Sequence, residues 1–284
     1  MSETTWFITG ASSGLGYALA EHVLQNGERV VMGARTVGPM NELASRYPDR
    51  GLAVELDVTK PDQRASAVQR CEDRFGSVDV LVNNAAIDFL GAVEEQDEAA
   101  YRATFEVNFF APVELMRLVL PGMRSRKRGT IVNISSMDGI ASVPVNGTYS
   151  ASKFAIEGIT ETLWQEIEPL GLRAFLVEPG SFRTGIETRS HFAGSVIDDY
   201  EATSGRFRKI MENIRPEQFP GDPANAAAAI YQEVHSGSNR HHLILGSDAY
   251  RLIGAKLDAL RSEFDAIRDL AFSTDYPDAG EAIL

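Results

Sequence analysis

Short apolar runs alternate with longer amphipathic stretches along most of this chain. Continuous apolar runs are typical of strands that are buried on both faces of a sheet. The runs that predict strands are residues 6–9, 29–34, 52–56, 78–82, 130–134, 173–177 and 242–245. Apolar side chains at helical spacing predict helices over residues 15–25, 40–47, 63–75, 99–124 and 149–170. This alternation predicts an α/β fold, in which helices cover both faces of one doubly wound parallel sheet of about seven strands.

The last third of the chain follows a different pattern. Residues 181–215 mix glycine, serine, charges and isolated aromatic side chains, which predicts short helices that form a lid over the substrate. Asp222 is followed by a proline, so we expect it to cap a helix that begins there. A final helix is expected over 248–272, within a C-terminal helical extension at 248–284. Because no linker interrupts the chain, we expect a single domain over residues 1–284.

Composition and charge narrow the class of protein. The 284 residues are 44% hydrophobic and 24% charged, which is ordinary for a globular protein. A net charge of −13 argues against nucleic-acid or anionic-membrane partners. No uncharged apolar run approaches the ~18 residues of a membrane-spanning helix. The first residues lack a signal-peptide pattern, so a cytoplasmic location is expected. The one cysteine, Cys71, is expected to pack passively.

A glycine-rich turn follows the first predicted strand. Residues 9–16 read TGASSGLG, directly before the first helix. Glycine permits positive φ angles and close approach of a ligand to the backbone. The free amides at a helix start favour a phosphate, so we expect a dinucleotide pyrophosphate here. A plain strand-to-helix turn is the alternative. The residues expected to contact the cofactor are Gly10, Ser12, Ser13, Gly14, Leu15 and Gly16.

The ends of later strands supply further candidates for nucleotide binding. An acidic residue after the second strand would bind both ribose hydroxyls, but this chain has Arg35, whose fork suits a 2′-phosphate. We therefore expect NADP(H) in preference to NAD(H), with a plain surface arginine as the alternative. Asp57, with Val58, is expected beside the adenine. Asn83 and Ala85 are expected to hold the loop beside the nucleotide.

Tyr149 and Lys153 are four residues apart on a predicted helix, so their side chains share one face. An ammonium beside a phenol favours the phenolate and is expected to lower the pKa of the tyrosine. That arrangement predicts a general acid and base that works near neutral pH. Ser136 lies thirteen residues before the tyrosine. An ordinary exposed helix pair is the alternative.

These residues resemble the short-chain dehydrogenase/reductase family, in its compact single-domain branch. The resemblance spans residues 9 to 184 and weakens after that. It implies a Rossmann-type domain and an NADP(H)-dependent oxidoreductase that interconverts a ketone or aldehyde and an alcohol by hydride transfer. The residues that carry it are the turn at 9–16, Asp57, the segment 83–85, Asn108, Ser136, Tyr149, Lys153, Pro179, Gly180 and Thr184.

The resemblance also implies a role for each residue. Tyr149 would be the general acid in reduction and the base in oxidation, and Lys153 would lower its pKa and bind the nicotinamide ribose. Ser136 would hold and polarise the substrate oxygen, while Asn108 would anchor a water that links the lysine to solvent. Thr184 would bind the nicotinamide carboxamide. Pro179 and Gly180 would form the wall behind the ring.

Two acidic residues beside this pattern bear on the substrate. Asp88 and Asp138 are either solvated loop carboxylates or contacts for a hydroxyl or amino group beyond the substrate carbonyl. Phe182 and Phe192 from the predicted lid are expected to contact a medium-sized, largely apolar carbonyl or alcohol substrate.

Several alternatives remain open from the sequence. The same fold without turnover would be an NADP(H)-binding sensor, and a sugar-nucleotide epimerase of the larger sister branch is a third reading. The histidines are scattered except for 241–242, whose side chains would point to opposite faces of a strand, so no metal is expected. Helices 99–124 and 149–170 are expected to pair across a two-fold axis in a homodimer or homotetramer.

Overall fold

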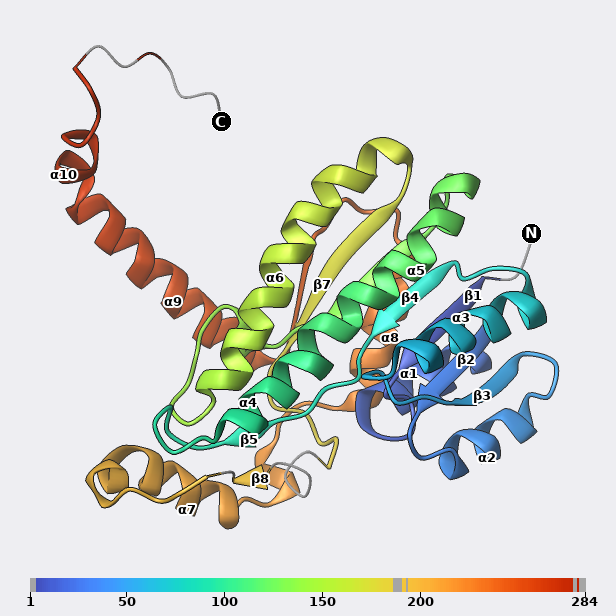
Figure 1. Cartoon of the computed structure of the whole chain (residues 1–284), viewed down its shortest axis with the longest axis horizontal. Coiled ribbons are helices and arrows are strands. Elements are labelled where there is room, and N and C mark those ends of the chain that lie inside the picture. Colours follow the sequence, from blue (N-terminus) through green and yellow to red (C-terminus); the bar gives the residue numbers. More distant parts are fainter. Residues whose placement is uncertain (1–3, 186–190, 193, 278–279, 281–284) are drawn as a thin grey trace.

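A computed structural model describes residues 4–185, 191–192, 194–277 and 280. Its centre is a seven-stranded parallel sheet in the order β3-β2-β1-β4-β6-β7-β9 (Figure 1). The strands are β1 (Thr5–Thr9), β2 (Arg29–Ala34), β3 (Gly51–Glu55), β4 (Val80–Asn83), β6 (Thr130–Ile134), β7 (Arg173–Pro179) and β9 (His242–Leu245). The predicted α/β fold with seven parallel strands is confirmed.

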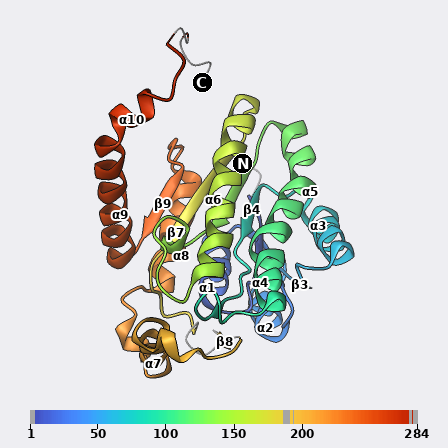
Figure 2. The same cartoon turned by 60° about the vertical axis from the view of Figure 1, so that its left-hand side comes forward.

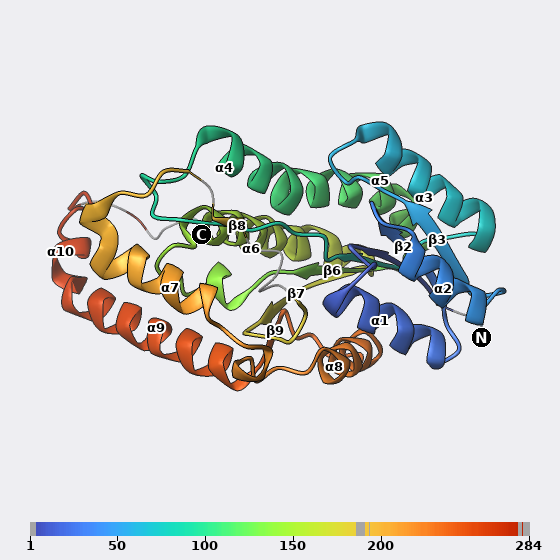
Figure 3. The ribbon, with the colours of Figure 1, turned by 90° about the horizontal axis from the view of Figure 1, so that it is seen from below.

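Helices cover both faces of the sheet, as Figure 3 shows from below. One layer contains α1 (Gly14–Gln25), α2 (Gly38–Arg46) and α8 (Pro223–His235). The opposite layer contains α3 (Pro61–Phe75), α5 (Ala111–Arg126) and α6 (Gly147–Ile167). Helix α8 begins as predicted, because the side chain of Asp222 accepts a hydrogen bond from the amide of Ala224 at 2.8 Å.

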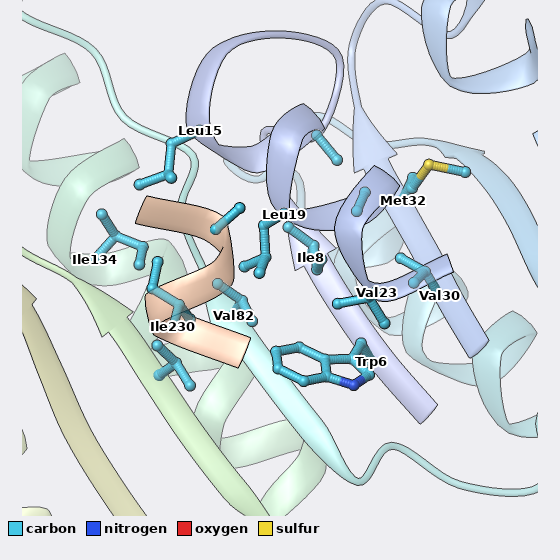
Figure 4. Packing of buried hydrophobic residues seen from close by; sticks show 14 of the residues in the cluster. Trp6, Ile8, Leu15, Leu19, Val23, Val30, Met32, Val82, Ile134 and Ile230 are labelled. Carbon is cyan, nitrogen blue, oxygen red and sulfur yellow. The ribbon is translucent and has the colours of Figure 1, made fainter. Parts of the chain in front are cut away.

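Strand β1 shows why both faces of the sheet are apolar. Trp6 and Ile8 point into the core beneath α1 and α8, whereas Phe7 points into the core beneath α3 and α5. All three are fully buried, since successive side chains of a strand alternate between faces. Figure 4 shows Leu19 of α1 beside Ile8 of this strand, and Ile230 of α8 beside Val82 of the neighbouring strand β4. The continuous apolar run in the sequence therefore corresponds to a doubly covered strand.

The predicted helix over 99–124 is one continuous helical run with a wider turn inside it. Helix α4 (Glu98–Phe105) leads into a π-helical turn, Glu106–Phe110, and then into α5. Asn108 lies in that turn and is buried. A π turn adds one residue to a helical turn, which sequence periodicity does not reveal, and such turns are common at functional sites.

A second, very small sheet was not predicted. Strand β5 (Phe89–Leu90) pairs in parallel with β8 (His191–Phe192). Two-residue strands are too short to leave a periodic signal. The rest of the predicted lid contains a 3₁₀ turn, a π turn and α7, which lie below the main sheet in Figure 1. The bounds are Asp198–Tyr200, Glu201–Gly205 and Arg206–Glu212; residues 186–190 and 193 of the lid lie outside the described part of the chain.

The predicted terminal helix is present but broken near its end. Helix α9 (Ser247–Ala266) is followed by α10 (Arg268–Phe272), and the pair extends away from the sheet along one side (Figures 1 and 2). Residues 278–279 and 281–284 of the predicted extension lie outside the described part. Among the described residues, no helix has the length and apolar character needed to cross a membrane.

Candidate active site

The candidate residues gather at the carboxyl edge of the sheet. Strand order reverses on either side of β1, and ligands bind in the crevice at such a reversal in open α/β sheets. The glycine turn follows β1, Arg35 follows β2, and Asp57 lies just beyond β3. Ser136 lies just beyond β6, and Gly180 directly follows β7. Parallel strands therefore bring residues that are far apart in the sequence to one edge.

The glycine turn packs tightly against the loop that follows β4. Gly10 and Gly14 have φ angles of 66° and 57°, in the left-handed region that favours glycine. A Cβ atom on Gly10 would lie 2.9 Å from the Cα of Ala85. A Cβ atom on Gly16 would lie 2.4 Å from the side-chain nitrogen of Asn84. The side chain of Ser13 does not cap α1. This turn and the helix amides behind it suit a dinucleotide pyrophosphate.

Two residues brace this turn: Thr9, and Asn84 from the segment 83–85 that was expected to hold the loop beside the nucleotide. The Thr9 hydroxyl accepts hydrogen bonds from the amides of Asn84 and Ala85, both at 3.0 Å. The side-chain amide of Asn84 donates to the carbonyls of Thr9 at 2.8 Å and Gly10 at 3.2 Å. Asn83 instead donates to Asn133 at 2.8 Å inside the sheet. Thr9 and Asn84 therefore position this loop, whereas Asn83 is bonded within the sheet.

Asp57 and Arg35 lie together at the far side of the crevice. Burial raises the pKa of Asp57, but hydrogen bonds from Thr59 and the charges of Lys60 and Arg35 outweigh it, so the net shift is downward. The Thr59 amide and hydroxyl donate to one carboxylate oxygen at 3.0 and 2.8 Å. Arg35 is exposed, and neighbouring Val58 is buried. An anion thus lies beside an accessible guanidinium at this edge.

Ser136, Tyr149 and Lys153 meet between β6 and the first turns of α6. The Lys153 side chain is buried, and its ammonium donates to the carbonyl of Ile134 at 2.8 Å. The ammonium lies 5.5 Å from the centre of the Tyr149 ring. The Ser136 hydroxyl lies close enough to the phenol to favour its ionised form. The spacing along α6 therefore places the pair on one face, as predicted from the sequence.

The prediction that the pKa of Tyr149 is lowered is wrong for the protein alone. Burial raises the pKa of Tyr149, and the charges of Asp138 and Asp88 raise it further, while the Ser136 hydroxyl opposes them. Burial lowers the pKa of Lys153 to about 8 against the opposing charges of Glu157, Asp88 and Asp138. The prediction counted the neighbouring ammonium but not burial or the two carboxylates.

Asn108 links the cofactor loop to α6. Its side chain accepts from the amide of Ile87 at 2.9 Å and donates to the carbonyl of Ile87 at 3.0 Å. It also donates to the Ser152 hydroxyl at 3.0 Å, one residue before Lys153. The side chain therefore fixes the segment after β4 against the catalytic helix. A role in anchoring a water remains a prediction.

The wall after β7 is held by a residue from the C-terminal extension. Asp248 accepts from the amide of Ser181 at 2.8 Å, and a Cβ on Gly180 would lie 2.2 Å from that carboxylate. Thr184 is half-buried and lies a few residues further along this segment. Phe182, however, is buried in the main core, and its ring packs against Gly221. The prediction that Phe182 contacts the substrate is therefore wrong, because its strand-like bridge with residue 221 turns the ring inward.

The lid is fastened to the body by a buried acid. Glu95 accepts from the amides of Ala92 at 2.9 Å and Ile197 at 3.0 Å, and it pairs with Arg208 at 3.2 Å. Burial raises the pKa of Glu95, but these partners outweigh it and lower the pKa overall. The Arg208 guanidinium also lies 5.0 Å from the centre of the Phe192 ring. Sequence reasoning missed this clamp because its members come from three separate segments.

A second group of polar residues lies one helical turn beyond Lys153. Glu157, Glu178 and His242 come from α6, β7 and β9, and their ligand-type atoms all lie within 4.8 Å of one another. His242 bonds with Glu178 at 2.6 Å. Burial, followed by the charge of Glu178, raises the pKa of Glu157 to about 8. Burial and this neighbouring charge therefore favour the protonated form of Glu157; the absence of a metal stays a prediction.

Replacing Glu157 by glutamine is expected to weaken the pH dependence of stability. A carboxyl group whose pKa is raised on folding destabilises the fold as pH climbs from its unfolded pKa toward its folded pKa. The wild-type free energy of unfolding should therefore fall from pH 5 to pH 8 by about 1–3 kcal/mol more than that of the variant. Urea unfolding at both pH values measures this, with the exposed Glu161→Gln as control. Equal pH slopes would contradict it.

Comparisons with known proteins agree with this geometry. A family model described as short chain dehydrogenase matches residues 4–192. The oxidoreductase BOA17 of Botryotinia fuckeliana is 31% identical over 95% of this chain and 98% of its own length. A solved short-chain dehydrogenase from Streptomyces avermitilis is 37% identical, with a TM-score of 0.89 over 97% of this chain and 100% of that one. Another from Burkholderia cenocepacia, solved with NADP, is 27% identical, with a TM-score of 0.72 over 93% of this chain and 97% of that one.

Proposed function

The chain belongs to the short-chain dehydrogenase family, a family of oxidoreductases that use a nicotinamide cofactor, and we propose that it interconverts a ketone or aldehyde and an alcohol with NADP(H). The observation that carries this proposal is the meeting of Ser136, Tyr149 and Lys153 beside the glycine turn. Nucleotide binding alone would need the turn but not these three side chains. The sensor alternative lacks a comparable observation.

The proposed chemistry assigns the proton to Tyr149. When bound, the nicotinamide supplies or accepts the hydride. In reduction the Tyr149 hydroxyl donates its proton to the carbonyl oxygen, and in oxidation the phenolate takes a proton from the alcohol. The Ser136 hydroxyl holds that oxygen and polarises it. The buried ammonium of Lys153 supplies positive charge one helical turn away, where it offsets the carboxylates nearby.

The lid is proposed to exclude water from this chemistry. Phe192 lies on β8, directly against β5, and the Glu95 clamp ties the following segment to the body. Closing a lid strengthens electrostatic interactions in the site and prevents loss of protons to solvent. Phe192 is accordingly proposed to contact the substrate, whereas Phe182 supports the core beneath it.

A ketone-reduction assay tests the proposal directly. Purified protein is incubated with NADPH and a panel of ketones and aldehydes, and the loss of reduced-nicotinamide absorbance is followed. Turnover of at least one carbonyl compound is expected. Tight NADPH binding with no turnover across the panel, in either direction, would favour the sensor alternative and overturn the proposal.

NADP(H) preference is proposed to depend on Arg35. Replacing this exposed arginine by alanine should lower kcat/KM for NADPH by roughly 10- to 100-fold, since a charge-assisted bond to a phosphate is worth about 1.5–3 kcal/mol. The value for NADH should change by less than about threefold. Steady-state kinetics with both nucleotides measures this, with Arg70→Ala on α3 as a surface control. Equal losses for both nucleotides would contradict the assignment.

We propose a homodimer or homotetramer that uses the outer face of α4, α5 and α6. Tyr101, Phe110, Leu118 and Phe154 are 40%, 50%, 39% and 45% exposed on this face. Large apolar side chains exposed on neighbouring helical elements are typical of a protein interface. Light scattering coupled to size-exclusion chromatography measures the state.

A further inference from the structure

Asp138 is a buried carboxyl group in the active site with an incomplete set of partners. Its side chain is only 4% exposed. One oxygen, Oδ2, accepts from the Asn146 amide at 3.3 Å and lies 3.5 Å from the Ser136 hydroxyl. The other oxygen, Oδ1, is buried and has no well-aligned hydrogen-bond donor among the described residues, although the backbone amide of Val143 lies close enough to lower the pKa of the carboxyl group. Buried carboxylates are normally paired or fully hydrogen-bonded, so an open acceptor here needs an explanation.

A second open acceptor belongs to the residue that holds Asp138. The side-chain oxygen of Asn146 is likewise buried and without a hydrogen-bond partner in the described part of the chain. The amide nitrogen of the same side chain is committed to Asp138. Asp138 and Asn146 therefore each present a hydrogen-bond acceptor on the loop between Ser136 and Tyr149. A ligand that matches it must bring several donors.

The loop that carries Asn146 is held in a strained conformation. Val145 has a φ angle of 67°, which is a true outlier for a β-branched residue. Its carbonyl accepts from the amide of Gly91 at 3.0 Å, so the segment after β5 fixes the strained backbone. Strain of this kind persists where surrounding contacts enforce it, and it clusters at ligand-binding sites. The arrangement around Asp138 is thus a built feature of the fold.

Charge favours a cation at this place. Asp88 adds a second carboxylate, whose charge raises the pKa of Tyr149 as the charge of Asp138 does. The buried ammonium of Lys153 donates its hydrogen bond to the carbonyl of Ile134, so its charge acts on Asp138 without a direct bond to it. Two negative groups in a cleft raise the local concentration of positively charged ligands. A protonated amine has three donors and no acceptor, which matches the open oxygens of Asp138 and Asn146.

We propose that Asp138 and Asn146 bind the protonated amino group of an amino ketone, or of the corresponding amino alcohol, whose oxygen lies at Ser136 and Tyr149. This inference rests on the proposed oxidoreductase function and narrows its substrate class. The short distance between Asp138 and Ser136 places the amine on a carbon next to the carbonyl carbon or one further along. The rest of the substrate would occupy the apolar part of the cleft.

Such a substrate would also assist its own reaction. The charge of Asp138 raises the pKa of Tyr149, which weakens the phenol as an acid. An ammonium group beside Asp138 offsets that charge and removes part of this effect. Amino substrates should therefore gain in kcat as well as in binding, because the benefit acts on the proton transfer itself.

The test uses three ketones that share one alkyl tail and differ only beside the carbonyl, where they carry an amino group, a hydroxyl group or hydrogen. The wild-type protein should prefer the amino ketone over the plain ketone by at least about 30-fold in kcat/KM, as expected for a desolvated charge pair. This preference should fall as pH rises through the pKa of the substrate amine. A trimethylammonium analogue separates charge from hydrogen bonding, and it should keep only part of the preference.

Asp138→Asn supplies the matched variant. The ratio of kcat/KM for amino over plain ketone should collapse to within about threefold of unity, since the neutral amide offers no charge. Asparagine keeps the size and shape of the side chain, so the variant removes mainly the charge. Asp62→Asn, a substitution of an exposed acid on α3, should keep the wild-type ratio.

The outcomes separate this inference from the proposed function. If the wild-type protein reduces none of the three ketones nor any other carbonyl compound, the proposed function fails. If it reduces the plain ketone as well as the amino ketone, the amine site alone is overturned. An equal preference for the hydroxy ketone would mean that a neutral donor fills the site, which also overturns the cation assignment. These wild-type measurements hold even if Asp138→Asn fails to fold.

Discussion

Replacing Tyr149 by phenylalanine is expected to lower kcat for ketone reduction by about 100- to 10,000-fold, the usual contribution of a positioned acid or base. The substitution removes only the hydroxyl group. The ring keeps its place above Lys153, whose ammonium lies 5.5 Å from the ring centre and is held by the carbonyl of Ile134. Affinity for NADPH should therefore change by less than about fivefold.

Steady-state kinetics and a fluorescence titration with NADPH distinguish the two effects. The control is Tyr250→Phe, because that tyrosine is 72% exposed on α9 and lies outside the proposed site. A Tyr149→Phe protein that kept a tenth or more of wild-type kcat would show that the proton comes from another group. The buried Asp138, with a pKa raised to about 6, would then be the nearest candidate acid.

The parts of this site that were predictable are those encoded locally. The glycine turn, the position of Arg35 after β2 and the spacing of Tyr149 and Lys153 each depend on a few neighbouring residues. Their meeting at one edge follows from the parallel sheet, because all its strands end there. Alternation of apolar runs and helical stretches was therefore enough to predict the sheet and the edge at which these residues meet.

The parts that were missed depend on contacts between distant segments. Asp248 reaches Ser181 across 67 positions of sequence, and Glu95 reaches Ile197 across 102. No local pattern marks such pairs, since the sequence around each acid does not reveal that its side chain is buried against a distant segment. The pKa of Tyr149 was misjudged for the same reason: its sign is set by burial and by carboxylates from two other loops. Charge neighbours on one helix are visible in a sequence, whereas burial is not.

Replacing Gly16 by alanine is expected to lower the affinity for NADPH by about 10- to 100-fold and to destabilise the protein by about 1–3 kcal/mol. The new Cβ would lie 2.4 Å from the side-chain nitrogen of Asn84 and 2.7 Å from the carbonyl oxygen of Gly10. That nitrogen donates to the carbonyls of Thr9 and Gly10. The added methyl group would therefore displace the side chain of Asn84, whose hydrogen bonds hold the glycine turn in place.

The chain offers a matched control for this substitution in α6. Gly158 is exposed, and a Cβ there would meet no atom within 4 Å. Gly158→Ala should stabilise the protein by about 0.5–1 kcal/mol, because alanine is the better helix former, and it should leave NADPH affinity unchanged. Urea unfolding and nucleotide titration on both variants measure the pair of effects. Both substitutions add one methyl group to a glycine in a helix. Opposite signs of the stability change would therefore assign the loss at Gly16 to the contact with Asn84. Equal changes would mean that the glycine turn accommodates the added methyl group.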